Sequence, residues 1–516
     1  MSLFRVKYLS FFFALISVLS FFNIIYSYYF NFYLNLNTYY ISLISSSLIA
    51  ILFYKIKTEE KKPTIFEKIL TVFLGYILLP LILSIPFYFS IYNLTFLNSI
   101  FESVSGFTST GFTIFNDIDY IDQSLILWRS SIQWIGGLYF LFSIIFLMDI
   151  YDESLKKSLT NFISFDSAEI LKQTIKIFLL YSGLTVAIFI ILNIVDIRTF
   201  NSLNLAMTII SSGGFLPSDE LSSILINNTQ IIIFSLLMLV SFFSIFFIYN
   251  LIFFRSKNLN FFYEDIHLFL YFIIIVTIFF IFFSFDNNFT YSFLSLASSI
   301  SNIGISLQID QTNLNFIYLI LVIIGGSFFS TSSGLRFLKI YSLTKYSLNQ
   351  ILSFSKPKNI FMNKLMFSKI NFDTNEINKY FLTIVIFIIS LFKYSINEIL
   401  SYSRPKNIFI NKLLFSKNNF EPSETNKYFL SVLIFVISMI LLSSLLTVSG
   451  IDFERSFKLS ILTLMNTVNS SAYGLSEFDF QNLHFVTKYF LIFFMIIGRV
   501  ELLSLLLIAK KFLFKY

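Results

Sequence analysis

The 516-residue sequence contains no cysteine, only two histidines, and only 13% charged residues. Without cysteine the chain cannot form disulfides, thiolate zinc sites, iron–sulfur clusters or a thiol nucleophile. The two histidines, His267 and His484, leave almost no material for histidine-based catalysis or metal binding. A soluble globular protein carries about a quarter charged residues, so the low charge also argues against a soluble fold.

Apolar and aromatic residues are abundant instead. The chain is 56% hydrophobic and contains 71 Phe and 29 Tyr, more than a soluble core of this size could bury. The composition therefore predicts an all-α polytopic membrane protein. A net charge of +7 could indicate a nucleic-acid partner, but the basic residues lie in short clusters between apolar runs, as they do in membrane proteins. We therefore expect a membrane lipid environment and no nucleic acid.

Ten apolar runs are candidates for membrane spans, which need about 20 mostly apolar residues each. They lie at 9–30, 38–54, 67–90, 124–148, 174–195, 229–254, 266–285, 314–335, 428–448 and 485–509. Clusters of Lys and Arg fall in alternate connections between these runs, whereas the opposite connections have few or none and carry acidic residues. By the positive-inside rule, we expect a multi-pass protein of the cytoplasmic (inner) membrane with both termini cytoplasmic.

A tandem duplication lies before the last pair of spans, because residues 349–390 recur with few changes as 397–438. The first copy contains an apolar run at 380–392, which is too short to cross a bilayer and has basic flanks. We predict that this run lies in the interface or on the cytoplasmic face. A functionless insertion is the alternative.

A pore-like pattern occurs four times, each time in an outer connection between two spans. A half-length run rich in Ser and Thr ends in Gly and then an apolar residue, at 101–112, 204–215, 296–305 and 465–475. A single such run would usually be a helix with a C-capping Gly. Irregular backbone is excluded from lipid unless it is buried in protein or lines a water-filled path, and carbonyls freed by a Gly can replace the hydration shell of a cation. The candidate filter residues are Ser109, Thr110, Gly111, Phe112, Ser212, Gly213, Gly214, Phe215, Asn302, Ile303, Gly304, Ala472, Tyr473 and Gly474.

Further motifs accompany this pattern: Gln133-Trp-Ile-Gly-Gly137, Gly325-Gly-Ser327, Ser330-Thr-Ser-Ser-Gly334 and Gly498-Arg-Val-Glu501. With them, residues 65–516 resemble the Trk, Ktr and HKT superfamily of potassium transporters, specifically the membrane subunit of bacterial Trk and Ktr systems. The resemblance implies four pseudo-symmetric span–pore loop–span repeats around one central pore. Two further N-terminal spans are similar to the Trk branch. Gly rather than Ser at position 111 favours potassium over sodium within that family.

The expected domains follow from the spans and the resemblance. They are an N-terminal hairpin (1–60), pore repeats 1 to 3 (61–150, 168–256 and 262–345), a cytoplasmic or interfacial segment with the duplication (346–427) and pore repeat 4 (428–516).

The resemblance also implies a gate below the filter, where small residues interrupt the second span of the third repeat. Its residues here are Gly325, Gly326, Ser330, Thr331 and Gly334, and Arg499 is implied to contact them as a cationic barrier. From position alone, Arg499 lies deep in an apolar run and should face a pore or a partner. Arg336 could instead be a basic anchor at the interface. Arg129 could be an interfacial anchor or an ion-pair partner of Glu102, and the resemblance favours the pair.

For partners, the resemblance implies a homodimer and a separate cytoplasmic nucleotide-binding regulatory subunit. The basic region 336–427 could dock that subunit or bind anionic lipid. We expect no cofactor in this chain, potassium as the substrate, and no enzymatic activity; whether sodium or protons are coupled stays open. The alternatives are a sodium-permeable or non-transporting scaffold on the same fold and a membrane-embedded enzyme.

Overall fold

The structure is a computed structural model that describes residues 5–56, 63–147, 170–253, 263–283, 289–307, 314–354, 422–475 and 478–500. Within these ranges the chain is helical, and the only pairing of extended backbone is one isolated bridge between Ile324 and Leu335. The prediction of an all-α fold is confirmed. The chain divides into two compact units, 1–337 with 431–516, and 338–430.

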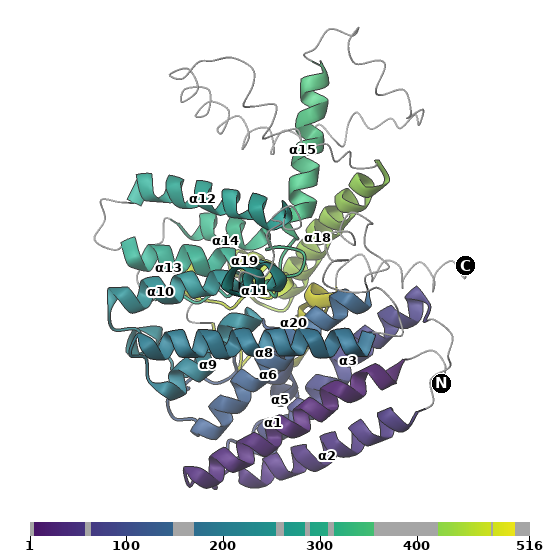
Figure 1. Ribbon diagram of the computed structural model, residues 1–516, viewed down its shortest axis with the longest axis vertical. Coiled ribbons are helices and arrows are strands. Elements are labelled where there is room, and N and C mark those ends of the chain that lie inside the picture. Colours follow the sequence, from purple (N-terminus) through teal and green to yellow (C-terminus); the bar gives the residue numbers. More distant parts are fainter. Residues whose placement is uncertain are drawn as a thin grey trace. The chain divides into compact units, whose positions relative to one another are not determined.

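The N-terminal hairpin consists of α1 (Ser10–Tyr29) and α2 (Leu36–Lys55), which lie side by side in Figure 1. Ser20, Ser42 and Ser46 are fully buried, and the Ser20 hydroxyl donates to the Ser42 hydroxyl at 3.1 Å. Small residues allow two apolar helices to approach closely where the hydrophobic effect cannot drive them together. Outward-facing Phe, Ile and Leu side chains on both helices remain exposed, as expected of a surface that faces lipid.

The next helices are α3 (Ile65–Leu83), α4 (Ile85–Tyr88), α5 (Phe96–Phe107) and α6 (Gln123–Phe146). A capping box of Thr64 and Glu67 begins α3. Pro80 lies inside α3, and its carbonyl accepts a hydrogen bond from the Ser103 hydroxyl of α5 at 2.7 Å. The short helix α5 is therefore anchored to a spanning helix, and α6 is buried from Ser124 to its end.

Three further groups of helices each begin with a long helix that is followed by a short one. They are α8 (Ile170–Ile194), α9 (Thr199–Ser211), α10 (Asn228–Met238) and α11 (Ile245–Phe253); α12 (Tyr263–Phe283), α13 (Phe289–Ile300) and α14 (Asn315–Ile323); and α18 (Pro422–Val448), α19 (Phe453–Leu464) and α20 (Phe485–Val500). The remaining long helix, α15 (Phe337–Phe354), belongs almost entirely to the second compact unit.

Six helices in the described ranges are long and apolar enough to cross a membrane: Val6–Tyr29, Leu36–Lys55, Ile65–Tyr88, Lys172–Ile194, Glu264–Ile281 and Tyr428–Val448. Four predicted spans are not among these six. The run 124–148 forms the single helix α6, the run 485–509 is described only to residue 500, and the other two are interrupted. The run 229–254 is broken between α10 and α11, and the run 314–335 is helical only to Ile323. Backbone hydrogen bonds join the two interrupted segments to each other. Hydropathy alone does not reveal these bonds.

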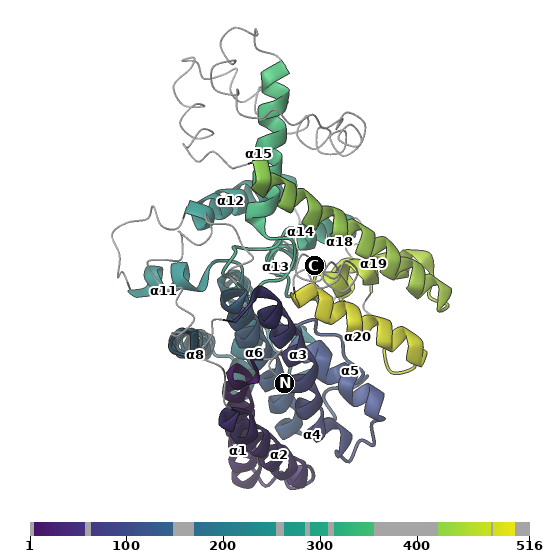
Figure 2. The same cartoon turned by 90° about the vertical axis from the view of Figure 1, so that its right-hand side faces the viewer.

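The first compact unit closes on itself. α6 packs on α9, α10 on α13, α14 on α19 and α20 on α5, so each group contacts the next and the last contacts the first. Figure 2 shows α5 and α20 side by side. The predicted boundaries between repeats stay predictions. The run 380–392 and most of the duplicated segment lie outside the described residues.

Candidate functional site

The same backbone turn follows each of the four short helices α5, α9, α13 and α19. Its first residue has a left-handed conformation, with φ of 55° at Ser109, 53° at Ser212, 60° at Asn302 and 46° at Asn466. The N–H of the following residue donates to the carbonyl five residues earlier, at 2.8 to 3.0 Å: Thr110 to Ser105, Gly213 to Thr208, Ile303 to Ser298 and Thr467 to Leu462. This is a helix C-cap that turns the chain sharply out of the helix.

Side-chain hydrogen bonds join three of the four pairs of neighbouring turns. The Ser212 hydroxyl of the second turn donates to the Ser301 carbonyl before the third at 2.6 Å. Asn466 of the fourth turn donates to the Thr110 hydroxyl of the first at 2.9 Å, and Asn302 of the third donates to the Thr467 hydroxyl at 3.4 Å. Four segments far apart in sequence are thereby fixed around one point.

The second residue after each left-handed residue lies where the turns meet. These residues are Gly111, Gly214, Gly304 and Val468. A Cβ built on Gly111 would lie 2.8 Å from the Cα of Gly214, and one on Gly304 would lie 2.6 Å from the Val468 carbonyl oxygen. Gly111 and Gly304 also have φ of 81° and 83°, which side chains disfavour. The first three turns therefore bring together the predicted filter residues 109–112, 212–215 and 302–304.

The predicted position of the fourth turn is corrected by this geometry. Ala472 and Tyr473 lie in a short 3-10 helix (Ser471–Tyr473) that Gly474 caps, beyond the ring, and the Tyr473 hydroxyl hydrogen-bonds Ser299 of α13 at 3.0 Å. Asn466, Thr467 and Val468 occupy the equivalent places. A pattern that depends on Gly does not include them, because the fourth turn has Val468 where the other three have Gly111, Gly214 and Gly304. The third and fourth turns both begin with Asn, and this shared residue is the sequence signal that locates the fourth turn.

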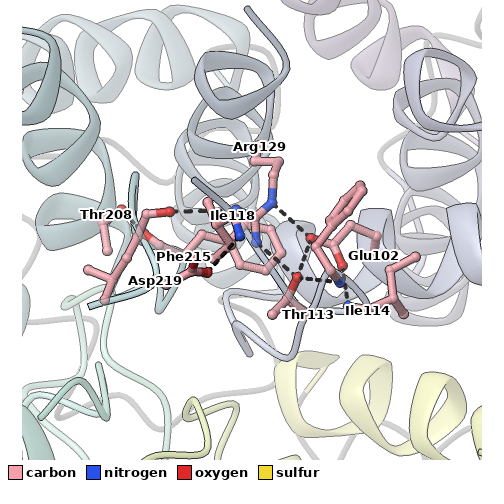
Figure 3. A network of polar contacts seen from close by, with 10 residues as sticks. Glu102, Thr113, Ile114, Ile118, Arg129, Thr208, Phe215 and Asp219 are labelled. Atoms are coloured by element: carbon pink, nitrogen blue, oxygen red, sulfur yellow. Dashed lines mark hydrogen bonds and ion pairs between the residues drawn. The ribbon is translucent and has the colours of Figure 1, made fainter. Parts of the chain in front are cut away.

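A buried ion pair supports the first turn (Figure 3). Arg129 Nε lies 2.9 Å from Glu102 Oε1, and both side chains are almost completely buried. The other Glu102 oxygen accepts from the Ile114 N–H at 2.9 Å, and Arg129 Nη2 donates to the Thr113 hydroxyl at 3.0 Å. The guanidinium also lies 4.2 Å from the centre of the Phe215 ring in the second turn. The ion-pair interpretation of Arg129 is thus confirmed, and the interfacial-anchor alternative is wrong.

The predicted gate is an irregular loop, residues 324–336, between α14 and α15. Gly325 N–H donates to the Leu335 carbonyl at 2.8 Å, which closes the base of the loop. Ser327 and Ser332 donate their N–H groups to the carbonyls of Phe242 and Ser241, both at 3.0 Å. The loop, which includes Gly326, Ser330, Thr331 and Gly334, therefore lies in the break between α10 and α11 and satisfies the backbone groups exposed there.

Two arginines bind this loop from different sides. Arg336 Nη1 donates to the carbonyls of Ser327 at 3.1 Å and Ser332 at 3.0 Å, so this residue is a buried part of the loop, not an interfacial anchor. Arg499 on α20 is 2% exposed; its Nη1 donates to the Thr331 carbonyl at 2.9 Å and its Nε to the Thr108 carbonyl. Both guanidinium groups lie over the Phe140 ring. The contact between Arg499 and the loop is as expected; its role as a barrier stays a prediction.

No family model matches the chain. The chain is 25% identical to an uncharacterized cation transporter of Methanocaldococcus jannaschii over 63% of this chain and 69% of the relative. It is 21% identical to the Trk system potassium uptake protein TrkH of Halomonas elongata and 24% identical to TrkG of Escherichia coli. Those two alignments each cover 52% of this chain, and 59% and 58% of the relatives. The match thus spans less than two thirds of either Trk protein.

Among solved structures, the crystal structure of the potassium transporter TrkH from Vibrio parahaemolyticus matches with a TM-score of 0.70. The superposition covers 98% of this chain and 97% of that one, at 17% identity. The chain is similar in sequence to these Trk proteins and has the fold of TrkH. The relatives are named as transporters and uptake proteins, which fits the expectation that the chain is not an enzyme.

Two adjacent carboxylates at the start of α12 also contact both broken regions. Glu264 Oε1 accepts from the Phe328 N–H of the loop at 2.9 Å, and Asp265 Oδ1 accepts from the Ser244 N–H after α10 at 2.8 Å. No prediction from the sequence included Glu264 or Asp265. The sequence signal was the position of two adjacent acidic residues, close to His267, at the start of an apolar run. Acidic residues at such a place usually have buried partners.

Proposed function

We propose that this Trk-type chain takes up potassium across the cytoplasmic membrane as the pore subunit of a Trk-like system. The observation that carries the proposal is the ring of four equivalent turns within one chain. Each turn ends a half-length helix, so the negative end of each helix dipole lies at one of the turns. Such an arrangement suits a monovalent cation that exchanges its hydration shell for backbone oxygens.

The filter that we propose consists of residues 109–112, 212–215, 302–305 and 466–469. The gate that we propose is the loop 324–336 together with Arg499. The Arg499 guanidinium joins the Thr108 carbonyl at the first turn to the Thr331 carbonyl of the loop, so it lies where filter and loop meet. A fixed positive charge at that place opposes cation passage, and ions pass when the loop and Arg499 separate.

We further propose the topology and partners that the resemblance implies. Both termini are cytoplasmic, the chain forms a homodimer, and a nucleotide-binding subunit docks on the basic region 336–427. The relatives named as parts of Trk systems support a separate regulatory partner. Deleting 349–396 removes one copy of the duplication, and survival of both uptake and partner binding would show that the extra copy is dispensable.

Rubidium uptake tests the main proposal. The full-length chain is expressed in cells that lack their own potassium uptake systems, and initial rates are measured against external rubidium with sodium as competitor. We expect saturable uptake with rubidium preferred over sodium. Equal uptake of sodium would favour the sodium-permeable alternative, and absence of uptake despite correct insertion would favour the scaffold. Varying external sodium and pH in the same assay determines whether either ion is coupled.

A further inference from the structure

The fourth turn differs from the other three at the place where they meet. Gly111, Gly214 and Gly304 have no side chain there, whereas Val468 has a β-branched one. The backbone before Val468 does not compensate for this larger side chain, because it has a left-handed residue and a hydrogen bond equivalent to those of the other three turns. The isopropyl group must therefore occupy space that three glycines leave empty.

Val468 contacts all three of the other turns. A Cβ built on Gly214 would meet only Val468 side-chain atoms as its nearest neighbours, at 2.4, 2.9 and 3.0 Å. One built on Gly111 would lie 3.0 Å from Val468 Cβ. On the third side, the Val468 N–H donates to the Ile303 carbonyl at 3.4 Å. The second and fourth turns are not neighbours in the ring, so a contact between Gly214 and Val468 crosses its centre.

A dehydrated cation needs oxygen ligands on all sides, and a valine side chain supplies none. Apolar constrictions also exclude water, which closes a pore to hydrated ions. On the basis of the proposed function, we propose that the Val468 side chain closes the ion path at the level of the three glycines. It determines the rate and ion preference of uptake, because ions pass only when it moves off Gly214.

The residue that orients the fourth turn also contacts the gate loop. Asn466 accepts a hydrogen bond from the Ser333 hydroxyl at 3.1 Å and donates to the Thr110 hydroxyl and the Met495 carbonyl, both at 2.9 Å. A displacement of the loop that pulls on Ser333 would act on the turn only two residues before Val468. Asn466 thus connects the turn that carries Val468 to the gate loop.

Substitution of Val468 tests the proposal in the full-length chain in cells. We expect Val468→Gly to raise the initial rubidium uptake rate about tenfold, the effect of a modest reduction in barrier, and to weaken the preference for rubidium over sodium. Val468→Ala should be intermediate. Val72→Ala is the matched control, because Val72 is a fully buried valine of α3 outside the four turns, and its truncation should leave ion preference unchanged.

A chemical measurement locates the side chain independently of transport. The chain has no cysteine, so Val468→Cys introduces its only thiol. We expect silver ions, which resemble potassium in size, to react with that thiol from the outside and excess rubidium to slow the reaction. A Val72→Cys control should not show rubidium protection.

The outcomes separate the two proposals. If the wild type takes up rubidium and Val468→Gly has the same rate and ion preference, the closure by Val468 is wrong and the proposed function stands. If only Val468→Gly transports, the closure is supported as the dominant barrier. If both proteins insert and neither transports, the proposed function fails and the closure by Val468 fails with it. A thiol at 468 that silver does not reach would also overturn the closure.

Discussion

Two buried arginines contact opposite ends of the same filter segment, residues 108–113, and they differ in their partners. Arg129 donates to the Thr113 hydroxyl at one end and pairs with Glu102, whereas Arg499 donates to the Thr108 carbonyl at the other end. Among the residues that the structure describes, Arg499 has no carboxylate within ion-pair distance, and its Nη2 has no hydrogen-bond partner.

The difference distinguishes a support from a movable barrier. A buried charge costs several kcal/mol unless a partner and hydrogen bonds compensate for it. Arg129 has both, which makes it part of a rigid scaffold behind the turn. Among the described residues, Arg499 is held by backbone carbonyls and the Phe140 ring and has no carboxylate that compensates its positive charge. Uncompensated intramembrane charge is generally functional.

Breaking the paired arginine should have the largest effect. Glu102→Ala leaves the Arg129 charge buried and alone, and loss of one partner of a buried pair costs about 3–5 kcal/mol. We expect poor accumulation and a large fall in the thermal unfolding midpoint of the detergent-purified protein. The double variant Glu102→Gln with Arg129→Gln should recover part of the loss; a single variant as stable as the wild type would contradict the supporting role.

Altering the segment between the two arginines should come next. Gly111→Ser places a side chain against the Gly214 backbone at a positive φ, and Gly304→Asp does the same against the Val468 backbone. We expect either to lower the rubidium preference over sodium or abolish uptake while insertion is retained. Gly183→Ser in α8 is the control, since a Cβ there meets nothing within 4 Å. Unchanged preference in both filter variants would count against the filter assignment.

Removing the uncompensated arginine should change transport more than stability. Arg499→Gln takes away the positive charge between the first turn and the loop, and we expect uptake to rise about tenfold, as for a barrier lowered by little more than 1 kcal/mol. The unfolding midpoint should stay within a few degrees of the wild type or rise, in contrast to Glu102→Ala. Arg499→Lys keeps the charge and should resemble the wild type; a fall in uptake with Gln would refute the barrier.

The smallest effect should come from the carboxylates that hold the loop near Arg499. Glu264→Gln and Asp265→Asn keep an oxygen acceptor but remove the charge that strengthens the bonds to Phe328 and Ser244. A weakened charge-assisted bond is worth about 1 kcal/mol, so we expect uptake to change a few-fold, with ion preference retained. The Ala variants should change it more. A shift in preference would place these residues at the filter instead.

Much of the fold was predictable because it depends on local patterns. Apolar runs near 9–30, 38–54 and 428–448 indicated spans, and Ser-rich half-length runs indicated the short helices α5, α9 and α13. The register of the fourth turn was not predictable from glycine, because Val468 stands two residues after the left-handed Asn466, where the other three turns have Gly. Glu264 and Asp265 were missed because their partners lie on other broken helices.

The sequence by itself determined that the chain is a helical membrane protein without thiol chemistry, since hydropathy and residue type depend on no distant contact. It also determined three of the four turns, because a Gly after a Ser-rich run marks them locally. Only the tertiary structure decided that Arg129 is paired, that Arg499 has no carboxylate partner among the described residues, and that Val468 meets Gly111 and Gly214. Those facts depend on which segments the closed arrangement of helices brings together.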